Sequence, residues 1–222
     1  MIAIRPPEYY PRLETVALMM VAETFVLADT YQYSRQSFQN RAKMRNPEGW
    51  QWVSVPLKGG QHGLPIRDVR IRHVEGWQKK HWRAFTYNYR ATPFFEFYEP
   101  ELRAVFDQDW EQLADLTCAT MLLTHRLFDL DTTMLRASEM PDEPDYLASV
   151  FNHLEGNTLI ASPASAAVDA EQVDSVETLV FEHPRYRQAF DGFEAGMMAL
   201  DVLFSYGPQA RTIVRDSIRA FF

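Results

Sequence analysis

The sequence predicts an α/β fold with a mostly parallel sheet, flanking helices and a helical insertion. Short apolar runs of strand length alternate along the chain with longer segments of helical periodicity. The chain also opens with a strand, a loop, a helix and a second strand, as wound α/β folds do. Three helical segments follow one another between residues 77 and 128, which indicates the insertion. A length of 222 residues fits one domain, and we expect residues 1–222 to form it.

The amino-terminal third carries strand patterns on either side of a polar stretch. A glycine-rich run, Gly59 to Gly63, marks a loop after the polar stretch. The elements expected here are, in order, a strand at Ile2–Ile4, a helix at Leu13–Ala22, strands at Thr24–Leu27 and Trp50–Leu57, a loop at Lys58–Pro65 and a strand at Val69–Ile71.

The remaining residues alternate between helical and strand patterns, with breaks at Pro93, Gly156 and Gly207. Pro208 follows the last glycine and suits the first turn of a helix. The elements expected here are helices at Trp77–Tyr89, Phe94–Phe106 and Trp110–Phe128, a strand at Thr132–Ser138, a helix at Asp145–Leu154, strands at Thr158–Ala161 and Glu177–Phe181, and helices at Ala195–Tyr206 and Pro208–Phe221.

The composition is that of a soluble globular protein. Hydrophobic residues make up 46% and charged residues 23% of the chain. The longest apolar run, Ala17–Val26, is broken by Glu23 and is far shorter than the roughly 18 residues that span a bilayer. The amino terminus has no signal-peptide pattern, and the single cysteine, Cys118, excludes an internal disulfide. We therefore expect a cytoplasmic protein with no membrane span.

The net charge of −8 is unevenly distributed. Residues 1–100 hold 14 of the 22 basic and 9 of the 30 acidic residues, so this part is positive. Residues 101–222 hold 8 basic and 21 acidic residues. A cationic half in an acidic protein favours a small anionic substrate over a nucleic acid, because the acidic half repels a long phosphate chain. The alternative is that both charged parts are only solvated surface.

The polar stretch from Asp29 to Arg45 is a candidate ligand site. It follows a predicted strand and has four cations against one acid, together with Gln32, Tyr33 and Asn40. Ligands of open α/β sheets bind beyond the carboxyl ends of the strands, and arginine binds phosphate with two hydrogen bonds. Arg41 and Lys43 lie two apart, so on a strand they point the same way. The alternative is a polar loop whose amide side chains cap its own backbone.

Two histidines are candidate acid–base residues. His81 lies in the helical segment QKKHWR beside Lys80, and His183 follows the predicted strand 177–181. The alternatives are a partly buried histidine on a solvated basic face and an ordinary loop histidine. The other histidines are isolated in the sequence, so we predict no metal site.

Three further polar residues are weighed against structural roles. Asp201 lies on an apolar helix face, and we expect it to be buried and paired, for example with a basic amino-terminal residue, rather than catalytic. Ser162 lacks a nucleophile-elbow motif and Cys118 falls inside a helix. Neither pattern indicates an activated nucleophile.

Three segments of the chain resemble the WbqC-like protein family. They are DTYQYSRQSFQNRAKMRNPEGWQWVSVPLKG from Asp29, WQKKHWRAFTYNYRATPFFEFY from Trp77 and FEHPRYRQAFDGFEAGMMALDVLFSYGP from Phe181. The sequence departs from the family pattern at three places. Arg5 lies near the position of the family's histidine, and Ser162-Pro163 replaces Ser-Gly-Pro. Val168 replaces the tyrosine that precedes the aspartate, here Asp169.

The resemblance implies a transferase-type enzyme of bacterial surface-polysaccharide (O-antigen) biosynthesis that acts on a nucleotide-linked sugar or a similar anionic metabolite. The departures leave a second hypothesis open, a non-catalytic relative that binds such a ligand or a partner enzyme. No cofactor is indicated. The candidate catalytic residues are Asp29, His81 and His183, and the candidate ligand-binding residues are Arg5, Gln32, Tyr33, Asn40, Arg41, Lys43 and Lys80.

Overall fold

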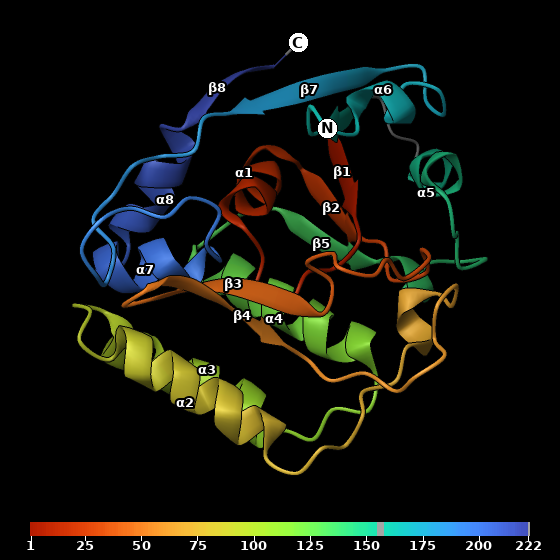
Figure 1. Ribbon diagram of the computed structural model, residues 1–222. Coiled ribbons are helices and arrows are strands. Elements are labelled where there is room, and N and C mark those ends of the chain that lie inside the picture. The colour runs from red at the N-terminus through yellow and green to blue at the C-terminus, as the bar shows by residue number, and fades with distance from the viewer. Residues whose placement is uncertain (155–157, 222) are drawn as a thin grey trace.

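A six-stranded sheet with the strand order β5-β2-β1-β6-β7-β8 is the centre of the computed structural model, which describes residues 1–154 and 158–221 (Figure 1). Its first five strands are parallel, and the last pairs antiparallel with β7. The strands are β1 (Ile2–Arg5), β2 (Thr24–Leu27), β5 (Thr133–Arg136), β6 (Leu159–Ala161), β7 (Val176–Phe181) and β8 (Ile218–Phe221). The predicted α/β fold with a mostly parallel sheet is confirmed.

Helices flank this sheet on both faces. They are α1 (Leu13–Val21), α2 (Trp77–Tyr89), α3 (Phe95–Asp107), α4 (Leu113–Leu127), α5 (Leu147–His153), α6 (Ala166–Asp169), α7 (Leu200–Tyr206) and α8 (Gln209–Arg215), with short turns η1 (Ile66–Asp68) and η2 (Ala137–Glu139). Alternating side chains of the strands enter two different cores, as the period of a strand requires. Ala3 and Phe25 pack with α1 and α7, whereas Ile4 and Val26 pack with α5.

The three helices predicted between residues 77 and 128 lie consecutively between β4 (Gly49–Ser54) and β5 in the chain. Aromatic side chains hold them against the rest of the core. Phe85 lies 5.4 Å from Phe106 between ring centroids, and Phe95 lies 5.2 Å from Phe204 of α7. None of the described helices is long and apolar enough to cross a membrane.

Part of the polar stretch from Asp29 to Arg45 is a strand. β3 (Arg41–Asn46) pairs antiparallel with β4 (Gly49–Ser54) in a separate two-stranded hairpin. Ala42 and Met44 are buried on one face of β3, whereas Arg41 and Lys43 lie on the other. The strand therefore alternates, but with charged residues on its outer face, so the hydrophobic pattern was too weak to indicate it.

The other differences concern element ends. The last predicted helix ends at Arg215, and its predicted final turn is β8, because the chain there pairs with β7. α7 begins at Leu200 rather than Ala195, and Val69–Ile71 forms only isolated bridges. The predicted helix stop at residue 156 lies outside the described residues.

The junction of α7 and α3 requires a glycine, which gives a first prediction. Gly207 has φ of 56°, and a Cβ there would come within 2.5 Å of the Phe94 ring. We expect Gly207→Ala to lower the free energy of unfolding by roughly 2–4 kcal/mol, since it adds backbone strain to overpacking. Urea denaturation measures this.

Gly59→Ala is the matched control, because a Cβ at Gly59 meets no atom within 4 Å. Its free energy of unfolding should stay within about 0.5 kcal/mol of wild type. Equal stability of the two variants would contradict the packing described at the α7–α3 junction.

Candidate functional site

The strand order places one pair of strand ends at the position where open α/β sheets bind ligands. From β1 the chain proceeds to β2 on one side, and later to β6 on the other side of β1. Ligands of such sheets bind beyond the carboxyl ends of the strands, where the order reverses. Arg5 ends β1, and Ser162 directly follows β6.

A partly buried guanidinium occupies this position. Arg5 Nη2 donates hydrogen bonds to Ser165 Oγ at 2.6 Å and to Ser162 Oγ at 3.3 Å. Its Nη1 lies 3.7 Å from Asp169 Oδ2. Burial lowers the pKa of Arg5, although the charge of Asp169 acts in the opposite direction. The guanidinium remains protonated at neutral pH, so the site presents a partly buried positive charge.

Two neighbouring groups have unused hydrogen-bonding capacity. The Tyr31 hydroxyl and Asp169 Oδ2 are buried atoms with no hydrogen-bond partner among residues 1–154 and 158–221. Burial raises the pKa of Tyr31, and the charge of Asp169 adds to this effect, so the phenol keeps its proton and can donate. Buried polar groups are normally satisfied, and exceptions need an explanation such as a ligand. We call Arg5, Tyr31, Ser162, Ser165 and Asp169 the Arg5 cluster.

Asp29 lies at the end of β2, as predicted, but it is fully buried and bonded to the protein. Its Oδ2 accepts hydrogen bonds from Arg136 Nε at 2.6 Å and Ser138 Oγ at 2.7 Å, and its Oδ1 accepts from the Ser138 N–H. Burial would lower the pKa of Arg136, but the hydrogen bond to Asp29 raises it. These contacts join the ends of β2 and β5 and favour a structural role for Asp29.

The loop after Asp29 is largely bonded to itself. The Tyr33 hydroxyl donates to Asn40 Oδ1 at 3.1 Å, and Asn40 Nδ2 donates to the Val55 carbonyl. Gln39 Oε1 accepts from the Ser34 N–H. Tyr33 and Asn40 therefore match the alternative of a self-capped polar loop, whereas the Gln32 side chain is exposed.

Arg41 and Lys43 do point the same way, on the outer face of β3. The Arg41 guanidinium stacks 4.1 Å from the Trp52 ring, and Lys43 Nζ lies 4.3 Å from the Trp50 ring. Arg45 differs, because it is only 2% exposed and donates to Gln188 Oε1 and to backbone carbonyls. Only the first two cations of β3 are therefore available at the surface.

His81 is a buried, neutral side chain of α2. Its Nε2 lies 3.2 Å from the Ser54 carbonyl, which can only accept, so Nε2 carries the proton. Its Nδ1 then accepts from the Tyr9 hydroxyl at 2.9 Å. Burial lowers the pKa of His81 to about 4, although the hydrogen bond to Ser54 opposes this. Both ring nitrogens are engaged, which favours a structural role.

His183 is held in a similar way after β7. Its Nδ1 donates to the Pro184 carbonyl at 3.2 Å, and its Nε2 accepts from the Gly196 N–H at 3.0 Å. These bonds engage both ring nitrogens. The structure therefore does not bring Asp29, His81 and His183 to a shared hydrogen-bond partner.

Lys80 lies on the exposed side of α2 beside a groove. This groove has a volume of about 520 Å³ and includes Asn46, Glu48 and Tyr87. A second groove of about 560 Å³ separates α2 from α3. Both grooves are lined by exposed charged residues such as Arg83. The Arg5 cluster is the stronger candidate, because it combines a partly buried charge with buried polar atoms that lack hydrogen bonds among the described residues, at the strand ends.

The sequence did not indicate Tyr31 or Ser165, and it indicated Ser162 only as an unactivated hydroxyl and as part of a motif departure. Tyr31 lies inside the polar stretch, but its relation to Asp169 depends on how β2 and β6 lie around β1. The two motif departures at Arg5 and Ser162-Pro163 were the available signal, since they prove to be in contact. No group of three or more possible metal ligands occurs among the described residues.

Comparison with known proteins places the chain in a family. The sequence profile of the WbqC-like protein family matches residues 6–213. The chain belongs to the WbqC-like protein family. It is 27% identical over 231 residues to the uncharacterized protein Rv1507c of Mycobacterium tuberculosis (strain ATCC 25618 / H37Rv), covering 96% of this chain and 97% of that protein. No solved structure matches the chain.

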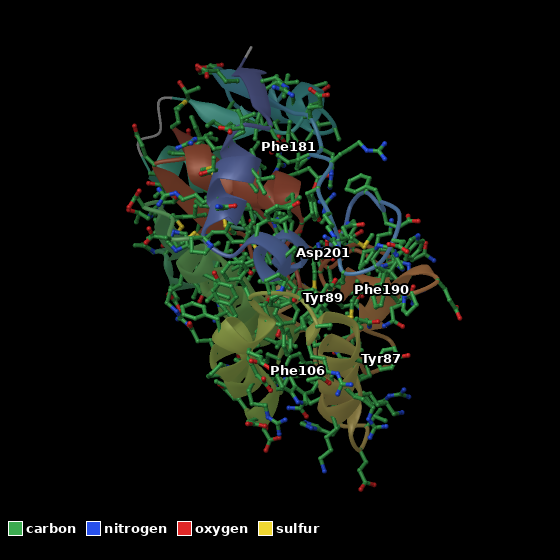
Figure 2. The ribbon with its side chains drawn as sticks, turned by 90° about the vertical axis from the view of Figure 1, so that its left-hand side faces the viewer. Tyr87, Tyr89, Phe106, Phe181, Phe190 and Asp201 are labelled. Carbon is green, nitrogen blue, oxygen red and sulfur yellow. The ribbon has the colours of Figure 1, made fainter. Side chains whose placement is uncertain are left out.

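All three WbqC-like segments meet at a buried carboxylate. Tyr89 donates a hydrogen bond to Asp201 Oδ1 at 2.9 Å, and Tyr186 donates to Oδ2 at 2.8 Å. Tyr89 also accepts the Arg45 N–H of β3. Figure 2 shows Tyr89 and Asp201 close together where α2 and α7 meet. The predicted burial of Asp201 is confirmed, but its partners are these two hydroxyls rather than a basic amino-terminal residue.

The His81 contacts lead to a prediction about pH. The folded pKa of about 4 lies below the usual value of about 6.5, so the unfolded chain binds a proton that the folded chain resists. The stabilisation is complete above pH 6.5 and is lost as the pH falls towards 4. Between pH 7 and 4, the free energy of unfolding should fall by about 2–3 kcal/mol more in wild type than in His81→Gln. Urea denaturation at each pH measures this, and parallel curves would contradict the burial of a neutral histidine.

Asp201 gives a prediction of opposite sign. Burial raises its pKa, while the hydrogen bonds from Tyr186 and Tyr89 oppose the shift. We expect Asp201→Asn to lower the free energy of unfolding by about 1–3 kcal/mol at pH 5. An amide has only one oxygen, so one tyrosine hydroxyl meets an N–H donor in place of its acceptor. The difference in the free energy of unfolding between wild type and Asp201→Asn should shrink as the pH rises above about 4. Above this pH the Asp201 carboxyl loses its proton in the unfolded chain before it does so in the folded chain.

Thermal and urea unfolding of Asp201→Asn and of Asp174→Asn, which changes an exposed aspartate, check this. The control should behave as wild type at every pH. A difference between wild type and Asp201→Asn that grows with pH would contradict the raised pKa.

Proposed function

We propose that this WbqC-like protein binds an anionic small molecule through the Arg5 cluster and acts as a transferase on a nucleotide-linked sugar in bacterial surface-polysaccharide biosynthesis. The observation that carries the binding proposal is the Arg5 guanidinium, partly buried at the strand-order reversal beside two unsatisfied polar atoms. A charge in this position supports recognition of phosphate or carboxylate, and Tyr31 supplies a further donor.

The pathway and the sugar-linked substrate are supported only by family membership. The net charge of −8 supports a small anion over a nucleic acid. We also propose that residues 1–222 form one domain, because one cluster of buried residues extends from β1 through α2–α4 to α8. A cytoplasmic location is consistent with the buried free thiol of Cys118.

A non-catalytic relative that binds such a ligand or a partner enzyme is the second candidate. The side chains of Asp29, His81 and His183 make their hydrogen bonds to other groups of the protein. This arrangement offers a substrate no unengaged acid or base at the three predicted catalytic positions. Within the Arg5 cluster, Asp169 Oδ2 is a buried oxygen without a hydrogen bond among the described residues.

Calorimetric titration with nucleotide sugars tests the binding proposal. Arg5→Ala should weaken binding of whichever nucleotide sugar binds wild type by roughly 10- to 150-fold, the equivalent of one charge-assisted hydrogen bond. Arg5→Lys should restore only part, because lysine cannot make the paired contact of a guanidinium. Arg103→Ala, which removes an exposed pair with Asp107 on α3, is the control.

Unchanged affinity in Arg5→Ala, with urea denaturation showing a folded protein, would overturn the Arg5 cluster as the site. Release of the nucleotide from the bound sugar in the presence of hydroxyl or amine acceptors separates the two candidates. Turnover supports the transferase, whereas tight binding without turnover supports the non-catalytic relative.

A further inference from the structure

The outer face of the β3–β4 hairpin carries a continuous row of aromatic and cationic side chains, which we call the hairpin ladder. Its members are Arg12, Phe38, Arg41, Lys43, Trp50 and Trp52. Arg12 stacks 4.1 Å from the Phe38 ring. Phe38 lies 5.5 Å from Trp52, and Trp52 lies 5.6 Å from Trp50, between ring centroids.

The strand register creates the ladder. Lys43 is opposite Trp52, and Arg41 is opposite Ser54, so each cation stacks on a tryptophan diagonally across the pair. The reverse face of the hairpin buries Met44 and Val53. Trp50 remains 42% exposed and Trp52 36%, although large aromatic side chains usually lose most of their exposed surface on folding.

The cations of the ladder retain donors for a ligand. Neither Arg41 nor Lys43 has a carboxylate within 4.0 Å among the residues that the structure describes. Arg41 Nε and Arg12 Nε are buried atoms that make no hydrogen bond within the same residues. Arg41 Nη2 donates to the Gln36 carbonyl, which holds the guanidinium in place over Trp52.

The ladder adjoins the Arg5 cluster through the loop between β1 and α1. The Tyr9 N–H donates to the Phe38 carbonyl at 2.9 Å, and Glu8 pairs with Arg12 at 2.8 Å. The charges of Glu8 and Arg12 both act on the pKa of Arg5, after the larger effect of its burial. Figure 1 shows the hairpin beyond the carboxyl ends of β1 and β2, on the side where Arg5 ends its strand.

We propose that the hairpin ladder is the nucleobase subsite for a ligand whose anionic part is held by the Arg5 cluster, so that the ligand class is a nucleotide rather than a sugar phosphate. This inference rests on the proposed function. A planar base stacks on an indole ring, and the neighbouring guanidinium and ammonium groups attract the phosphates. A neutral glycan would gain little from the two cations without carboxylate partners. Covering these cations with an apolar protein surface would cost desolvation free energy.

Calorimetric titration of the full chain with paired probes tests the inference. The probes are UDP-glucose, dTDP-glucose and GDP-mannose, each against the corresponding sugar 1-phosphate. At least one nucleotide sugar should bind wild type about 5- to 100-fold more tightly than its sugar 1-phosphate, the contribution of one stacked base. Trp52→Ala should remove that preference, and Trp52→Phe should keep much of it.

Arg5→Ala should instead weaken the binding of the nucleotide sugar and of the sugar 1-phosphate by the same factor. Trp50→Ala is a second variant in case Trp52→Ala fails to fold, and Phe97→Ala removes an exposed aromatic ring of α3 as the control. Binding should also quench the fluorescence of the two exposed tryptophans in wild type.

The outcomes separate the two proposals. A nucleotide sugar that needs Arg5 but binds the tryptophan variants as tightly as wild type would overturn the ladder and leave the Arg5 cluster standing. Equal affinity for a nucleotide sugar and its sugar 1-phosphate would overturn the ladder as well. Binding of no nucleotide sugar would overturn the proposed function together with this inference.

Discussion

The buried carboxylate of Asp201 is the constraint on which much of the structure depends. A carboxyl group without exposed surface is costly unless hydrogen bonds satisfy it. The hydroxyls of Tyr89 and Tyr186 supply those bonds from α2 and from the segment after β7. Because Tyr89 also accepts the Arg45 N–H, the same network fixes β3 against α2. The position of the hairpin is therefore linked to the hydrogen bonds of one buried carboxyl group.

That arrangement divides the polar residues of this WbqC-like protein into two groups. Asp29, His81 and His183 hold elements together, since their hydrogen-bonding atoms contact other parts of the chain. Arg5, Tyr31 and Asp169 are also buried or partly buried, but each of the last two has a buried atom without a hydrogen bond among the described residues. A functional site is recognised better by buried polar atoms without hydrogen bonds than by residue type, because histidine and aspartate form structural hydrogen bonds equally well.

The fold was largely predictable, and the site only in part. Each parallel strand is a short apolar run, so period and length were sufficient. β3 was missed because its outer face is charged, and β8 because its pairing with β7 overrides the local helical pattern. Among the site residues, Arg5 was predicted through its place in a motif, and Arg41 and Lys43 through their spacing. Tyr31 and Ser165 carry no local pattern that distinguishes them from ordinary loop residues.

The sequence by itself determined the fold class, the family and the orientation of side chains along each strand. These properties depend on periodicity and on segment order, which are local or linear features of the chain. Only the tertiary structure decided which polar groups are satisfied. Arg5 meets Ser165 across 160 positions, and Tyr89 meets Asp201 across 112. Burial and hydrogen bonding between such distant residues depend on how the sheet and hairpin pack, and the packing sets the charge and availability of each group.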